Sequence, residues 1–171
     1  MEEEKTLLNE VASEDDDFAN RPLDFLGDVG ATALVAEPDP AVRKKICEGL
    51  EELGYLITTP ATAKEALKAM RFHIFDVIVL NELFDTEDPR TNAVLSYLEN
   101  MAMSTRRRFF VALVSGTYQT MDRMAAFNRS VNMIINIQSI ESIAMIIKRG
   151  VTDNKAFYHI FQTTLQKMGK L

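Results

Sequence analysis

The chain has 171 residues, of which 47% are hydrophobic and 26% are charged, and its formal net charge is -6. This length supports one well-cored domain with an appendage, and no apolar run approaches the ~20 residues that cross a bilayer. Residues 1–30 carry ten Asp or Glu against Lys5 and Arg21, a balance of -8, which leaves +2 for residues 31–171. The composition therefore argues against a membrane protein, and the nearly neutral folded part argues against nucleic-acid binding, which needs a concentrated basic face.

The first segment of the chain predicts an acidic arm. MEEEKTLLNEVASEDDD is acidic where a secretory signal would be basic and then apolar. The single cysteine, Cys47, cannot form an internal disulfide, which fits a reducing compartment. We therefore expect a cytoplasmic protein in which residues 1–30 form a disordered N-terminal arm.

Residues 31–149 show the pattern of one α/β domain. Short apolar runs alternate with amphipathic stretches, as in repeated strand and helix units around a parallel sheet. The five runs are ATALVAEPDP, YLITTP, FDVIVLN, FFVALVSG and VNMIIN. After the first run, Asp39 has the position of a helix cap, Pro40 suits the first turn and Gly54 can end the helix. Five such units predict a three-layer, doubly wound (βα)5 sheet.

An additional helix is predicted at residues 150–171, after Gly150. Five apolar side chains share one of its faces: Phe157, Ile160, Phe161, Leu165 and Met168. This face packs either on its own domain or at an interface with a partner. The preceding helix, SIESIAMIIKR, is also apolar on more than one side, so we expect a homodimer formed through the last two helices.

Chemistry in such a sheet is expected at the carboxyl ends of the strands, where open parallel sheets bind ligands. The strand-end residues to inspect are Glu37, Pro38, Asp39, Asn81, Glu82, Ser115, Gly116, Asn136 and Ile137. Away from them, the one basic cluster is Arg106, Arg107 and Arg108. Its interpretations are a solvated loop edge, or a docking patch for an acidic partner or for the chain's own acidic tail.

The run LVAEPDPAVRKKICEGLEELGY resembles the opening of response-regulator receiver domains, the phosphoacceptor modules of two-component signalling. PATAKEALKAM resembles the second helix of that family, FDVIVLN the strand with the phosphorylated aspartate, FFVALVSG the strand that ends in Ser or Thr, and VNMIIN the strand that ends in Lys-Pro. The resemblance covers residues 31–149. It implies a flavodoxin-like strand order 2-1-3-4-5.

Part of the family's acidic pocket is kept, and the phosphoacceptor is not. Glu37 falls where the family has a metal-binding acid, but Pro38 replaces the next acid. Asp39 is acidic, and its simplest role is as a helix cap. Asn81 stands at the phosphoacceptor position, beside Glu82.

The positions that respond to phosphorylation in the family are also altered. Ser115 keeps the hydroxyl that senses the phosphoryl group. Asn136 replaces the lysine that pairs with it, Ile137 replaces the following proline, and Met133 replaces the aromatic switch residue. Only the hydroxyl and part of the acidic pocket match the family.

These departures predict a receiver that does not run the usual reaction. Phosphoryl transfer needs a carboxylate nucleophile, a divalent cation and a cation that neutralises the product, and an amide such as Asn81 is a negligible nucleophile. Glu37 and Asp39 leave at most a weak magnesium site, so we expect no catalysis and no resident cofactor. The resemblance implies a signalling module that acts through protein contacts, with the fourth helix, fifth strand and fifth helix as its output surface.

Two alternatives remain open from the sequence. The first is an active response regulator phosphorylated on Glu82 or Asp85. For Glu82 this is disfavoured because successive residues at a strand end point in different directions, and Asp85 is more simply a solvated loop acid. The second is a sensor of small ligands or anions that uses the vacated pocket and depends on Ser115.

Overall fold

A computed structural model describes residues 30–169 of the chain, and the arm predicted at 1–30 lies outside them except for Gly30. Five strands and six α-helices follow one another within the described part, with two short 3-10 helices among them. In chain order they are β1 Thr32–Ala36, α2 Pro40–Glu52, β2 Leu56–Thr58, α3 Ala63–Phe72, β3 Val77–Asn81, η3 Pro89–Thr91, α4 Ala93–Glu99, α5 Met103–Arg106, β4 Phe110–Ser115, α6 Arg123–Asn128, β5 Met133–Asn136, η4 Ile137–Ser142 and α7 Ile143–Lys167.

The five strands form one parallel sheet in the order β2-β1-β3-β4-β5. The predicted strand order is therefore confirmed. In the ladder, Ala36 lies opposite Leu80, Asn81 opposite Val114, and Ser115 opposite Asn136. The order reverses between β1 and β3, so the ends of these two strands open the crevice in which such folds place their sites.

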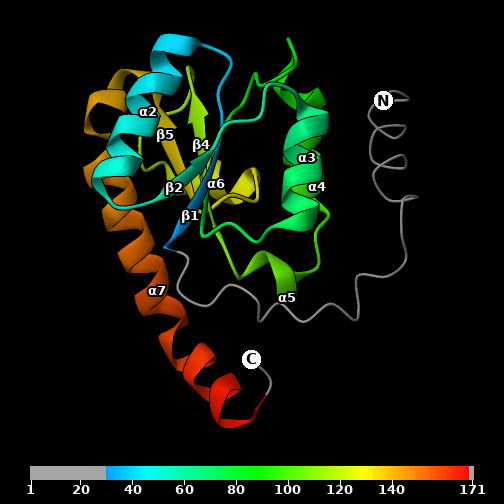
Figure 1. Ribbon diagram of the computed structural model, residues 1–171, viewed down its shortest axis with the longest axis vertical. Coiled ribbons are helices and arrows are strands. Elements are labelled where there is room, and N and C mark those ends of the chain that lie inside the picture. The colour runs from blue at the N-terminus through cyan, green and yellow to red at the C-terminus, as the bar shows by residue number, and fades with distance from the viewer. Residues whose placement is uncertain (1–29, 170–171) are drawn as a thin grey trace.

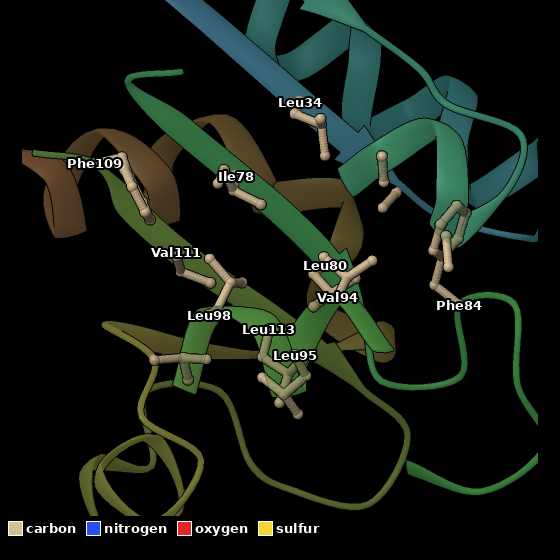
Figure 2. Close-up of a cluster of buried hydrophobic side chains, with 14 of the residues drawn as sticks. Leu34, Ile78, Leu80, Phe84, Val94, Leu95, Leu98, Phe109, Val111 and Leu113 are labelled. Carbon is tan, nitrogen blue, oxygen red and sulfur yellow. The ribbon is translucent and has the colours of Figure 1, made fainter. Parts of the chain in front are cut away.

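Helices cover both faces of the sheet and make it the middle of three layers (Figure 1). Helices α2 and α7 pack on one face against inward residues such as Val35 and Val79. Helices α3, α4 and α6 pack on the other face against residues such as Leu80 and Leu113, and Figure 2 shows the second of these clusters. Because strand side chains alternate in direction, neighbouring residues of one strand enter different cores.

Polar caps explain where several helices begin. The Asp39 carboxylate accepts hydrogen bonds from the backbone N–H groups of Ala41 and Val42, at 2.8 and 3.1 Å, and so caps α2 as predicted. The same helix ends at Glu52, and Gly54, two residues later, has a φ of +82° that suits glycine.

The C-terminal region differs from the prediction in one respect. The additional helix is present, but α7 runs without a break from Ile143 to Lys167, so the two helices expected on either side of Gly150 are one. A Cβ at Gly150 would lie 2.4 Å from Met133 Cε and 2.7 Å from Phe110 Cζ. Glycine at this position therefore allows α7 to approach the sheet closely and does not end the helix.

The helix predicted around NAVLSYLENMAM is also divided differently. Helix α4 ends at Glu99, and the short α5 follows at Met103–Arg106. Among the helices of residues 30–169, none has the length and apolar character needed to span a membrane.

Candidate functional site

The candidate site lies at the carboxyl ends of β1, β3 and β4 and is built from buried polar side chains. Glu37 and Ser115 are each 1% exposed, Glu82 is 5% exposed and Asn81 is 9% exposed. Buried polar groups are costly unless they are hydrogen-bonded. The partners of these four residues therefore decide what the site can do.

Glu37 and Asn81 form the first buried pair. Asn81 Nδ2 donates a hydrogen bond to Glu37 Oε2 at 2.7 Å, and Asn81 Oδ1 accepts one from the Leu83 N–H at 2.8 Å. The second carboxylate oxygen, Glu37 Oε1, accepts from the Asp39 N–H at 3.0 Å. Both functional atoms of the amide are thus engaged, and the 2.7 Å contact leaves no room for a ligand between the two side chains.

The environment of Glu37 opposes its ionisation. Burial raises the pKa of the Glu37 carboxyl above its ordinary value of 4.5, and the hydrogen bonds from Asn81 and Asp39 counteract this shift in part. An amide donor at position 81 therefore stabilises a carboxylate that is shielded from water. A second carboxylate in its place would remove this donor and add a like charge.

Glu82 and Ser115 form the second buried pair. Ser115 Oγ donates to Glu82 Oε1 at 2.8 Å, and the Gly116 N–H donates to the same oxygen at 3.1 Å. Ser115 Oγ in turn accepts from the N–H groups of Thr117 and Tyr118. A carboxyl oxygen is therefore already in place at the hydroxyl that, by the resemblance, senses a phosphoryl group.

The alternation of strand side chains separates the two pairs. Asn81 continues the series of Val77 and Val79, which belong to the core under α2 and α7. Glu82 continues the series of Ile78 and Leu80, which belong to the opposite core. The sequence argument that these neighbours point in different directions is confirmed, since Asn81 reaches Glu37 and Glu82 reaches Ser115.

Asn92 is a member of the site that the sequence analysis missed. It is 2% exposed, and its Nδ2 donates to the backbone oxygens of Asn81 and Glu82, both at 3.1 Å. Its Oδ1 accepts from the Leu95 N–H and caps α4. An asparagine before a helical run indicates a cap, but its reach back to the end of β3 depends on tertiary structure.

Two acids expected near the pocket lie away from it. Asp39 is exposed and its carboxylate is directed at the start of α2, so it does not belong to the buried acidic group with Glu37 and Glu82. Asp85 is exposed, and its Oδ2 accepts from the Ala63 N–H at 2.8 Å, at the first residue of α3. Asp85 therefore does not lean back toward Asn81, and it is bonded rather than simply solvated.

Asn136 and Met133 have structural partners of their own. Asn136 Nδ2 donates to the Tyr118 backbone oxygen at 2.7 Å, and its Oδ1 accepts from the Gln138 N–H at 2.9 Å. Asn136 thus fixes the loop after Ser115. Met133 is half-buried at the start of β5 and faces Gly150 of α7.

The chemistry that this arrangement allows is limited. Among residues 30–169, no group of three or more His, Cys, Asp or Glu side chains converges in a way that could hold a metal ion. Divalent cations such as magnesium need several oxygen ligands, and the Glu37 oxygens already accept two hydrogen bonds.

Comparisons with known proteins give the class of fold. No protein-family model and no curated protein matches the chain. The receiver domain of the Francisella response regulator 1452 is similar in structure, with 21% sequence identity over 73% of this chain and 99% of that domain, and a TM-score of 0.58. The chemotaxis response regulator CheY4 of Vibrio cholerae gives 15% identity over 71% of this chain and 99% of its own, with a TM-score of 0.54.

A longer protein matches in the same way. NtrX from Brucella abortus is 17% identical over 79% of this chain and 30% of its own length, with a TM-score of 0.62. The chain therefore has the fold of response-regulator receiver domains, and the resemblance stated from the sequence is confirmed for the fold.

Proposed function

We propose that this protein is a receiver-like signalling module that takes no phosphoryl group at the usual position and acts through protein contacts. The observation that carries the proposal is the buried hydrogen bond from Asn81 to Glu37. The side chain at the phosphoacceptor position is thus an amide, which is not a useful nucleophile toward phosphorus. Its hydrogen bond also engages Glu37, the acid that the family's pocket retains at the end of β1.

The second buried pair supports a module whose signalling state is fixed. Glu82 supplies an acceptor oxygen to Ser115 and Gly116, where the resemblance implies that a phosphoryl group would supply one. Such a module needs neither catalysis nor a resident cofactor.

The proposed contact surface is the groove between α6, β5 and α7. Its volume is about 220 Å³, with Met133 and Ile134 among its apolar lining and with Arg123 and Arg149, both exposed, beside them. Asp122 and Asp153 also line this groove, so a signalling partner that presents an apolar side chain with charges of both signs beside it would suit it.

The proposal is tested by treating the whole protein with magnesium and a small phosphodonor and measuring its intact mass. We expect no stable gain of a phosphoryl group. A gain would overturn the proposal, and peptide mapping would then assign the acceptor to Glu82, Asp85 or another residue.

Self-association through the far half of α7 is a further part of the proposal. Phe157 and Ile160 are 78% and 79% exposed, and with Phe161 and Met168 they form an exposed apolar stripe on one side of the helix. A second copy presents the same stripe, so two copies can cover it symmetrically. Sedimentation at micromolar concentration should show a dimer that Ile160→Glu dissociates, and a wild-type monomer would contradict this part.

A further inference from the structure

The basic cluster Arg106–Arg108 lies where α5 leads into β4, beside the far half of α7. Arg106 is held by neutral acceptors: its guanidinium donates to the backbone oxygens of Phe109 and Ser130 and to Asn132 Oδ1. Arg107 stacks over the ring of Phe161, with its Cζ 4.9 Å from the ring centroid. Within residues 30–169, no carboxylate forms an ion pair with any of the three arginines.

Two of these arginines each have one N–H group without a hydrogen-bond acceptor. Arg106 Nε and Arg107 Nε are both buried without a hydrogen-bond partner in the described part of the chain, and such donors carry a desolvation cost. Burial also lowers the pKa of Arg106 below its ordinary value, and the charge interaction with Tyr158 counteracts this shift in part. A desolvated cation over an aromatic ring is a site that an anion would stabilise.

The path of the chain brings an acidic segment to this site. In a parallel sheet all strands begin at the same edge, so Gly30, which precedes β1, and Arg108, which precedes β4, lie at one end of the molecule, together with α5 and the far half of α7 (Figure 1). The starts of β1 and β4 are two strand spacings apart, roughly 10 Å. Gly30 lies thirteen positions after Asp17 in the chain, and an extended segment of that length spans up to about 43 Å.

We propose that the acidic run Glu14–Asp17 of the same chain docks on Arg107 and Arg108, in the seam between α5 and α7. The run has four consecutive acids, and a carboxylate matches the fork of guanidinium donors in bidentate geometry. Docking there places the arm beside Phe161. Salt would release the arm from these arginines. This inference goes beyond the proposed function and does not depend on the state of the phosphoacceptor position.

The test is a paramagnetic relaxation experiment on the full chain. A spin label is attached at Ser13→Cys in a Cys47→Ala background, so that the label sits next to the acidic run. We expect the amide signals of residues 105–110 and of Phe161 to be broadened at low salt. The broadening should be lost in about 1 M salt, where the Debye length is about 3 Å, and in the double variant Arg107→Gln with Arg108→Gln.

A matched control removes the same charge elsewhere. Arg123→Gln with Arg149→Gln neutralises two exposed arginines beside the groove between α6 and α7 and should leave the broadening unchanged. The proposal is overturned if the signals of residues 105–110 are not broadened, or if the broadening survives the Arg107 and Arg108 substitutions. It is also overturned if the broadening appears only in mixtures of spin-labelled chains with separate isotope-labelled chains, because the occupant is then the arm of a second copy.

Discussion

Replacing Asn81 by aspartate restores the carboxylate of the receiver pattern and should destabilise the protein. The substitution removes the donor that lies 2.7 Å from Glu37 Oε2 and puts a carboxylate oxygen in its place. A hydrogen bond to a charged group contributes roughly 1.5–3 kcal/mol. Two like charges at that separation repel by about 6 kcal/mol at an effective dielectric constant of about 20.

The repulsion will not appear in full, because closely spaced carboxylates take up a proton or move apart. We therefore expect Asn81→Asp to lower the free energy of unfolding by about 3 kcal/mol at neutral pH. For a domain of this size that corresponds to a fall in Tm of about 10 °C. Magnesium should recover part of the loss, about 1.4 kcal/mol at ten times its dissociation constant, and should leave the wild-type protein unchanged.

A swapped pair provides the control. In Glu37→Gln with Asn81→Asp, the introduced amide can donate to the introduced carboxylate while its oxygen still accepts from the Asp39 N–H. The other oxygen of the introduced carboxylate can accept from the Leu83 N–H. We expect the double variant to recover most of the lost stability and to show no response to magnesium in thermal unfolding. The reasoning is refuted if Asn81→Asp unfolds at the wild-type temperature, or if the double variant is no more stable than the single one.

Three further predictions concern the frame around the site. Gly150→Ala would place a Cβ 2.4 Å from Met133 Cε, so overpacking outweighs the gain in helix propensity, and unfolding by urea should show a loss of about 1–2 kcal/mol in the free energy of unfolding. As a control, the Cβ of Gly116→Ala meets no neighbouring atom within 4 Å, and this substitution should be neutral. Equal effects of the two substitutions would contradict the packing argument. Asp39→Ala removes the cap of α2 and should cost about 1 kcal/mol in the same assay, whereas an unchanged midpoint would show that the cap does not contribute. Burial raises the pKa of Glu37 in the folded protein above 4.5. The stability advantage of the wild type over Glu37→Gln should therefore be greatest below pH 4.5 and shrink as the pH rises through the folded-state pKa. An advantage that grows between about pH 4 and about pH 8 would contradict burial as the cause of the shift.

Local patterns in the sequence predicted the features that depend on a few neighbouring residues. The five apolar runs predicted where the strands lie along the chain, and the cap at Asp39 follows from its position before Pro40. The separation of Asn81 from Glu82 follows from the period of two along a strand. The strand order came from the resemblance to receiver domains and was confirmed by the sheet.

Features that join distant segments could not be predicted in this way. Asp85 caps a helix that begins 22 residues earlier in the chain, and Asn92 reaches back to the end of β3. Gly150 looked like a helix end because glycine often ends helices, but its role depends on the side chains of Met133 and Phe110 in the sheet beneath. Each of these contacts depends on how elements pack, which the residue pattern of one segment does not record.

The side-chain amide of Asn81 gives the most direct test of the central claim, that a buried amide closes the phosphoacceptor position. Its two Nδ2 protons can be followed by NMR while magnesium and a small phosphodonor are added to the whole protein. We predict slow exchange with water and no change in chemical shift, because Nδ2 is held by Glu37 Oε2 in a buried pair. Rapid exchange in the free protein, or a shift of these signals when the phosphodonor and magnesium are added, would contradict the account.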